Sequence, residues 1–398
     1  TDGEIQVVVV NGGGGGTTTG QTITLQGRIN ADTVLRKANS YILKGIVYMV
    51  GNHTMTIEPG TIIKGAFSGT DVAALVITRG SKIIAAGTAT DPIVFTSLSP
   101  NPQSGDWGGI VLCGKAGYNL SYNGTAGLYQ VEGGIDNANG DGLAGSGDAV
   151  APTPVPNDNS GVLQYVRIEY AGYAFQPDKE INSLTMAAVG SGTTIDHIQV
   201  TYAKDDAYEW FGGSVNCKFL IAYKTQDDDF DTDNGYNGKV QFGLVMRDSL
   251  IADISTSEAF ESDNNATGTT SAPKTTAIFS NITAIGPRAT LSNFGNSLFR
   301  AGAQIRRNSA ISIFNSIIMG WPQGILIDAT TGTSTALNIE DSSLRLRNVT
   351  LAGNTVNLKF SGTAGATINS DATLTSWFTG AFYNNDLLTN TSDAKLIQ

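Results

Sequence analysis

Short runs of β-branched and aliphatic residues recur along the chain, and glycine, proline or asparagine ends each run. Residues 75–78 precede a turn at Gly80, and residues 93–97 follow a turn at Pro92. Runs of about four to eight such residues between turn residues predict β-strands, and no helical segments separate them. The pattern therefore predicts an all-β protein.

Similar runs recur along the chain at nearly constant intervals in sequence. Three runs follow one another at nearly equal steps: His197–Val200, Phe219–Ala222 and Phe242–Val245. A second series has longer, equally regular steps and starts at Asn281, Asn315 and Asn348. Aligning Ile57 with Ile77 gives a further, slightly shorter step.

Repeats of this length, built from strands and turns, are typical of a solenoid. We therefore predict a right-handed parallel β-helix, in which the three aligned asparagines form an internal amide ladder at one corner. A β-sandwich is the competing fold, but it needs hairpin turns about every 8–12 residues and fits the repeats less well.

The predicted β-helix spans residues 21–371 and contains a loop-rich insertion at 117–160. Residues 372–398 are rich in aromatic residues and suit a cap over the last coil. Residues 1–20 combine a strand with a glycine- and threonine-rich tether. An isolated strand leaves its backbone groups unpaired, so it must pair with its own domain or with a neighbouring subunit. The residues of this strand are Ile5, Val7, Val8, Val9 and Val10.

Composition and charge agree with this fold and limit the partners. Glycine supplies 48 of the 398 residues, as corners require, and only 15% of residues are charged, as dry inner faces require. The net charge of −11 disfavours nucleic acid and anionic lipid as partners. No run approaches the roughly 18 apolar residues of a transmembrane helix.

Cysteine usage and the chain start indicate the cellular setting. Cys113 and Cys217 lie in apolar, strand-like runs, which favours two buried free thiols over a long-range disulfide. The chain starts with Thr1 rather than Met, as a processed mature chain does. Together with acidic loops and many Asn-x-Thr/Ser turns, this start favours an extracellular or outer cell-surface location.

Acidic loops predict calcium binding. Alternating oxygen-bearing side chains can wrap around Ca²⁺, although the pattern of an EF-hand is incomplete because Val240 stands at the twelfth position. The alternatives are solvated acidic or glycine-rich turns. The candidate ligands are Asp229, Asp231 and Asp233 in one loop, and Asn137, Asn139 and Asp141 in another. A third acidic patch at 258–265 would lie near the first if the coils stack.

Carboxylate pairs support an enzymatic alternative. Asp205-Asp206 and Asp228-Asp229 are similar to the paired carboxylates of inverting glycosidases, in which one acid protonates the leaving group and the other activates water. Aromatic residues near these pairs would line a sugar groove. The residues of this predicted groove are Trp107, Asp205, Asp206, Tyr208, Trp210 and Asp228, with Phe230 beside them.

Five segments carry a family resemblance: Pro59–Thr61, Gly105–Leu112, Glu209–Gly213, Asp227–Gly235 and Glu261–Asn265. They resemble a group of right-handed β-helix surface proteins of Bacteroidota, over roughly residues 40–360. Such proteins are often lipoproteins or secreted proteins found beside TonB-dependent receptors. The resemblance implies a β-helix on the cell surface and no established activity.

Two functions are compatible with these observations. The first is a non-enzymatic, calcium-stabilised extracellular structural or binding protein. It would form a homo-oligomer, filament or surface layer, or bind an outer-membrane partner, through strand addition by residues 5–10. The alternative is a polysaccharide-binding or polysaccharide-cleaving β-helix of the lyase or glycosidase type.

Overall fold

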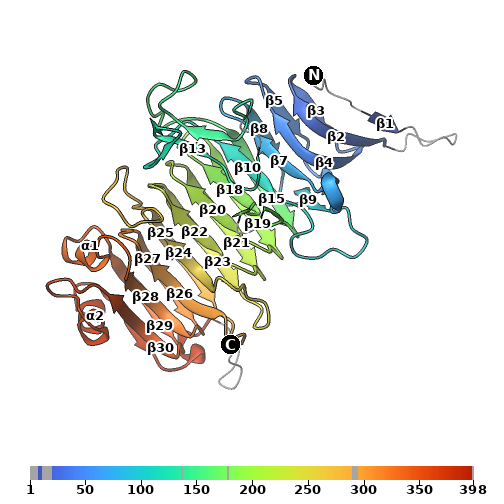
Figure 1. Ribbon diagram of the computed structural model, residues 1–398. Helices are drawn as coiled ribbons and strands as arrows, with labels where there is room; N and C mark the ends of the chain where they lie inside the picture. The colour runs from blue at the N-terminus through green and yellow to red at the C-terminus, as the bar shows by residue number, and fades with distance from the viewer. Residues whose placement is uncertain (1–7, 11–19, 136–137, 177–178, 289–294, 397–398) are drawn as a thin grey trace.

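The computed structural model describes residues 8–10, 20–135, 138–176, 179–288 and 295–396. Figure 1 shows strands stacked side by side from the blue N-terminal coils to the red C-terminal coils, and they form a single 25-stranded sheet. Neighbouring coils pair in parallel, with Leu184 opposite Tyr208 and Tyr208 opposite Phe230. The protein is therefore an all-β parallel β-helix, as the sequence predicts.

The 25-stranded sheet wraps around the coils as three parallel faces, each called a sheet below, and each full coil supplies strands to all three. The strands of the first sheet are β7 (Ala74–Ile77), β10 (Ile110–Cys113), β18 (Leu184–Ala187), β20 (Tyr208–Phe211), β22 (Phe230–Asp233), β24 (Ser257–Ser262), β26 (Phe299–Ile305), β28 (Gln323–Ala329) and β30 (Val356–Gly362). The other two sheets share long strands that cross a corner, namely β15 (Gly161–Glu169), β19 (Thr194–Thr201), β21 (Asn216–Tyr223), β23 (Lys239–Met246), β25 (Ile278–Ile285), β27 (Ser312–Met319) and β29 (Leu346–Ala352).

The first coils and the segments outside the regular coils have their own elements. The N-terminal strands are β1 (Val8–Val10), β2 (Thr22–Ile29), β3 (Thr33–Leu35), β4 (Ser40–Met49), β5 (Thr54–Ile57), β6 (Ile62–Gly65), β8 (Lys82–Ala86) and β9 (Ile93–Ser97). Short strands outside the coils are β11 (Ser121–Tyr122), β12 (Thr125–Ala126), β13 (Leu128–Gln130), β14 (Leu143–Gly145), β16 (Ala174–Gln176) and β17 (Lys179–Glu180). Strand β31 (Asp386–Leu388) and the helical segments η1 (Gly69–Asp71), α1 (Ala336–Glu340), α2 (Asp371–Phe378) and η2 (Thr391–Ala394) complete the described elements.

The sequence repeats predict the strand register over the central and C-terminal coils. Ile198 pairs with Leu220, and Leu220 pairs with Gly243, as the repeat of these runs requires. The alignment of Ile57 with Ile77 is wrong, because Ile57 pairs with Ala85, whereas Ile77 lies in another sheet. A pattern of alternating apolar residues does not distinguish one sheet of a coil from the next.

One corner of the coil is turned by a residue in the left-handed conformation, which asparagine tolerates better than most residues. On successive long strands this position is held by Tyr165, His197, Phe219, Phe242, Asn281, Asn315 and Asn348, all with positive φ. Asn348 Nδ2 donates a hydrogen bond to Asn315 Oδ1 at 3.0 Å. The asparagines are exposed, so the amide ladder lies on the outer surface. The prediction of an internal ladder is therefore wrong.

The insertion at 117–160 lies against the outer face of the first sheet. Tyr129 contacts both Tyr118 and Phe211, with ring centroids 4.7 and 4.9 Å apart. Ion pairs of Arg28 with Asp141 (2.7 Å) and of Arg79 with Asp148 (2.6 Å) attach it to the first coils. The insertion therefore forms a second layer over part of the β-helix.

The N-terminal strand pairs within its own chain. In β1, Val8 lies opposite Thr24 and Val10 opposite Thr22, in an antiparallel arrangement with β2. This pairing is the edge-strand alternative, and it covers the open edge of β2. Ile5, Val7 and the tether at 11–19 lie outside the described residues.

Cys113 and Cys217 are free and buried, which confirms the prediction of two thiols without a disulfide. Burial raises the pKa of each thiol to about 12, so both are protonated and unreactive at neutral pH. None of the helices in the described ranges has the length and apolar character of a membrane span.

Candidate functional site: an acidic cleft

Three successive coils carry a tetrapeptide of the form acid–x–aromatic–acid: Asp206–Glu209, Asp228–Asp231 and Glu258–Glu261. Side chains alternate between the two faces of a strand, so the aromatic residue and the last acid point to opposite sides. The aromatic residues stack inside the helix, with Phe230 5.8 Å from Tyr208 and 5.4 Å from Phe260. The repeated tetrapeptide therefore places one carboxylate per coil on the outer face.

These outward carboxylates form the acidic column, defined as Glu209, Asp231 and Glu261. Glu209 pairs in register with Asp231, and Asp231 with Glu261, on β20, β22 and β24. Adjacent strands are about 4.8 Å apart, so like charges are stacked at that spacing. This register confirms that the patch at 258–265 lies beside the acids at 227–233.

The first acid of each tetrapeptide lies at the turn before its strand or at the start of that strand. Asp206 Oδ1 accepts a hydrogen bond from the backbone N–H of Asp228 at 2.9 Å, and Asp228 Oδ1 accepts from that of Glu258 at 2.6 Å. Asn182 Oδ1 begins the series by accepting from Asp206 N at 3.2 Å. We call Asn182, Asp206, Asp228 and Glu258 the turn ladder; it satisfies backbone donors that the strands leave unpaired.

The acidic column and the first three members of the turn ladder line a cleft of about 230 Å³. Nine carboxylates and one arginine, Arg306, face it among the described residues. Outside the column and the ladder, its lining residues are Glu132 from the insertion, Glu180 from β17, Asp205, Asp227, Ser255 and Arg306. The cleft therefore concentrates much of the negative charge of the protein at one place.

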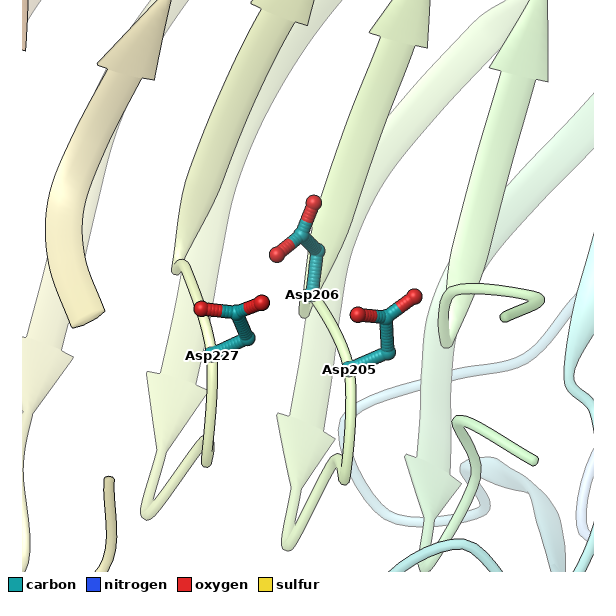
Figure 2. A group of neighbouring side chains, drawn as sticks. All are labelled: Asp205, Asp206 and Asp227. Carbon is teal, nitrogen blue, oxygen red and sulfur yellow. The ribbon is translucent and has the colours of Figure 1, made fainter. Parts of the chain in front are cut away.

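Two groups of carboxylates in the cleft are especially close. Asp205, Asp206 and Asp227 each offer an oxygen within 4.8 Å of the others. Figure 2 shows Asp205 and Asp206 on one coil and Asp227 on the adjacent coil, with Asp205 and Asp227 on the turns and Asp206 just before strand β20. Asp206, Glu209 and Asp231 form a second group with the same spacing.

Burial raises the pKa of these carboxyl groups because the charged form loses its hydration. Burial and repulsion from Asp253 raise the pKa of Asp227 to about 8. Burial raises the pKa of Asp231 to about 6, against the attraction of Arg306. Burial, followed by repulsion from Asp205, holds the pKa of Asp206 well above its usual range. At neutral pH the cleft therefore contains protonated acids beside carboxylates.

A buried arginine supports the cleft from inside the β-helix. Arg247 Nε lies 2.9 Å from Asp229 Oδ2, and both side chains are fully buried. The guanidinium also donates hydrogen bonds to the backbone carbonyls of Thr225, Asp227 and Glu258. Arg247 thereby fixes the backbone of two turns that carry the cleft acids.

The structure corrects the predicted sugar groove. Trp107, Tyr208 and Trp210 have no exposed surface, and neither has Phe230. Tyr208 donates a hydrogen bond to the carbonyl of Ile198, and Trp210 stacks on Tyr236 at 5.3 Å, both inside the β-helix. The aromatic residues belong to the core because they alternate with the acids; only Asp205, Asp206 and Asp228 of the predicted groove reach the cleft.

The predicted calcium loop is also arranged differently. Asp231 and Asp233 lie on strand β22 and not on a loop that wraps around an ion. Asp229 is bound to Arg247 inside the β-helix, away from the other two. The structure therefore does not bring these three carboxylates together: Asp229 precedes strand β22 and points into the core, whereas the extended backbone spaces Asp231 and Asp233 along the strand instead of wrapping them around one ion.

The second predicted calcium loop lies in the insertion. Asp141 forms an ion pair with Arg28, so a protein cation already balances its charge. Asn139 belongs to the same loop, and Asn137 lies outside the described residues. Asp141 therefore serves to attach the insertion to the first coils.

Sequence reasoning gave several residues of the cleft no place in the predicted groove or calcium loops, although Glu258 and Glu261 belong to the third acidic patch that it named. Glu209, Asp227 and Glu261 line it, and Glu258 lies at its end beside Glu261. The signal for Glu209, Glu258 and Glu261 is the tetrapeptide that recurs on three successive coils, and Asp227 immediately precedes the second tetrapeptide. Glu132, Glu180 and Arg306 come from irregular segments or later coils, and no local pattern indicates them.

Comparison with known proteins agrees with the fold. The family model of the pectate-lyase-like beta helix domain matches residues 27–392, which is most of the chain. No curated protein matches the sequence.

Proposed function

Since this chain belongs to the family of pectate-lyase-like beta helix domains, we propose that it binds a polysaccharide in the acidic cleft and cleaves a glycosidic bond there. The observation that carries the proposal is the group Asp205, Asp206 and Asp227, whose oxygens lie within 4.8 Å in an open cleft. Glycoside hydrolysis needs one carboxylic acid to protonate the leaving oxygen and one carboxylate to attack or to activate water. Carboxyl groups this close supply both forms, because they resist ionising together.

The accessibility of the three groups suggests their roles. Asp206 is 6% exposed, and one of its oxygens is used by the turn ladder, so it positions its neighbours. Asp205 and Asp227 are less buried and flank it (Figure 2). We assign the roles of proton donor and nucleophile to the pair Asp205 and Asp227, because both reach the cleft and burial raises the pKa of both. Their spacing is nearer to the roughly 5–5.5 Å of retaining enzymes than to the roughly 6.5–9.5 Å of inverting ones.

The charge of the cleft limits the substrate. Nine carboxylates repel a polyuronate, so the expected substrate is a neutral or amino-sugar polysaccharide. Such polymers are found outside cells, which agrees with the extracellular location that we propose for the chain.

The test is incubation of the full chain with neutral, amino-sugar and uronic-acid polysaccharides, followed by measurement of new reducing ends. Asp227→Asn and Asp205→Asn are each expected to lower the rate by about 100-fold or more. Asp386→Asn, the same change on exposed strand β31, serves as the matched control. Unsaturated uronate products, or full activity in both cleft variants, would contradict the proposal.

A binding protein without catalysis is the second candidate. Two carboxylates of the acidic column are already engaged, since Asn182 donates to Glu209 and Arg306 pairs with Glu261. Retardation of the protein in polysaccharide gels without any product favours this candidate. Self-assembly through residues 5–10 would require β1 to leave β2, and an unchanged oligomeric state after deletion of residues 1–20 would exclude it.

A further inference from the structure

A third group of carboxylates lies at the C-terminal end of the cleft, apart from the group that we assign to glycoside cleavage. Asp228, Glu258 and Glu261 offer oxygens within 4.8 Å of one another, from the adjacent coils of β22 and β24. Asp228 is 4% exposed, and Glu258 has no exposed surface. Two buried carboxyl groups at this distance need a positive partner or a proton between them.

Glu258 lacks a complete set of hydrogen-bond partners. Its Oε1 accepts a hydrogen bond from Thr256 Oγ1 at 3.2 Å, but its buried Oε2 has no donor among the described residues. An unsatisfied buried oxygen is costly, and a charged one is more so. The buried Oε2 atom of Glu258 therefore requires either a proton shared with Asp228 or a cation.

The turn ladder explains why the unsatisfied oxygen occurs here. Asn182, Asp206 and Asp228 each accept the backbone N–H of the following coil. At Glu258 the register between β24 and β26 shifts, so the next coil does not present the equivalent donor. Glu258 is the last member of the ladder and is left without the bond that its predecessors make.

The nearby arginines do not neutralise the group. Arg247 is bound to Asp229 and to backbone carbonyls. Arg306 pairs with Glu261, but its Nε also lies 2.8 Å from Asp263, which it shares with Arg307. Arg300 also attracts Glu258, but it pairs with Asp328 at 3.7 Å. When ionised, the three carboxylates therefore exceed the charge of the Arg306 guanidinium by two. This is the charge that a divalent cation balances.

We propose that Asp228, Glu258 and Glu261 bind a calcium-type divalent cation that joins the coils of β22 and β24. Carboxylate oxygens are the ligands that Ca²⁺ prefers, and irregular sites suit it better than Mg²⁺. The ion replaces the donor that the register shift removes and lies beside the cleavage group without belonging to it. The site differs from both calcium loops that the sequence suggested, although it uses the same acidic segment.

The test is titration of Ca²⁺ into the chelator-treated full chain, followed by calorimetry and by thermal unfolding, without polysaccharide. The expected result is one Ca²⁺ per chain and a higher unfolding temperature with Ca²⁺. Glu258→Gln keeps the shape of the side chain and the acceptor for Thr256, and it should weaken binding on the order of tenfold or more. Glu180→Gln removes the same charge from the lining of the same cleft and should leave binding nearly unchanged.

Two outcomes overturn the proposal: the wild-type chain binds no Ca²⁺, as it would if Asp228 and Glu258 shared a proton, or Glu258→Gln binds as tightly as wild type. If Glu258→Gln does not fold, Glu261→Gln on the less buried ligand gives the same readout. Because no polysaccharide is present, the result does not depend on the proposed cleavage.

Discussion

Two stacks of similar side chains run along the coils on different faces of this protein. On one corner, His197 lies 4.3 Å from Tyr165 and 4.4 Å from Phe219, between ring centroids. On the first sheet, the acidic column stacks three carboxylates in register. Aromatic rings attract one another when stacked, whereas carboxylates repel, so only the acidic stack needs partners. A groove of about 580 Å³ beside the aromatic stack is larger than the acidic cleft, yet it lacks a cluster of reactive groups among its described lining residues.

The partners of the acidic stack are visible in the structure. Asn182 donates a hydrogen bond to Glu209, and Arg306 pairs with Glu261. Beneath the stack, Arg247 pairs with Asp229 and holds the backbone of the coils that carry it. The aromatic stack remains partly exposed, with Phe219 at 39% and Phe242 at 40%. A β-helix stacks equivalent side chains of successive coils at the strand spacing. Stacked aromatic rings need no further partner, whereas stacked carboxylates need hydrogen-bond donors or cations.

Replacing Arg247, the cation inside the β-helix, should have the largest effect on stability. Arg247→Ala leaves Asp229 buried without a counter-ion, so we expect the free energy of unfolding to fall by about 3–5 kcal/mol. Equilibrium unfolding in urea measures this loss. Arg347→Ala, which removes an exposed arginine lying 4.9 Å from the ring of Phe382, should cost about 1 kcal/mol or less. Similar losses in the two variants would show that the acidic stack does not depend on Arg247.

Lowering the pH should increase the free energy of unfolding when free cations are removed. The folded-state pKa of Asp227 is about 8 and that of Asp231 about 6, both raised chiefly by burial from the usual 3.8. The folded chain therefore binds more protons than the unfolded chain between about pH 4 and pH 8, so stability falls as pH rises through this window. The expected loss is on the order of 2 kcal/mol or more.

Thermal unfolding with EDTA, at pH 5 and pH 8, measures this dependence. Asp227→Asn removes one of the titrating groups and should reduce the difference between the two pH values. A wild-type protein that is more stable at pH 8 than at pH 5 under these conditions would contradict the prediction.

The aromatic stack should tolerate truncation better. Phe219→Ala removes two stacking contacts from a side chain that is already 39% exposed, so we expect a loss of about 1 kcal/mol. Urea unfolding measures it against Leu250→Ala, whose side chain is 79% exposed and which should have almost no effect. A loss as large as that of Arg247→Ala would remove the distinction between the two stacks.

The pKa of Glu340 is lowered rather than raised, and its replacement should have the smallest effect on stability. Backbone N–H groups of Ile368 and Thr367 donate to it and lower its pKa to about 2. Its contribution to stability is therefore present above about pH 4.5 and is lost as pH falls toward 2. Glu340→Gln should slightly lower the unfolding temperature at pH 7 and leave it unchanged at pH 2, which differential scanning calorimetry can measure.

The repeats in the sequence carry most of the fold. A parallel β-helix aligns equivalent residues of successive coils, so the steps between His197, Phe219 and Phe242 predict the observed register. The same logic places the acids at 227–233 beside those at 258–265. Burial of the two cysteines also follows from the sequence, because each lies in an apolar strand.

The direction of individual side chains was harder to predict. Tyr208 and Trp210 lie next to Glu209 in the sequence, which predicts a groove that contains both aromatic residues together with acids. Alternation along β20 instead turns both aromatic side chains into the core and turns Glu209 outward. Asp229 has the spacing of a ligand to Asp231, yet it is the counter-ion of Arg247 within the core. A residue at the end of a strand can leave the alternation, and the sequence does not mark where this occurs.

The sequence by itself determined the all-β class, the stacking of the central and C-terminal coils and the presence of repeated acids, because backbone hydrogen bonding and side-chain alternation are local and periodic. Only the tertiary structure decided which acids share one cleft and which cation lies beneath them. Arg247 and Asp229 come from successive strands of a coil, and Glu132 and Arg306 reach the cleft from an insertion and a later coil. Such neighbours meet through the stacking of coils and the placement of loops, which no short-range pattern records.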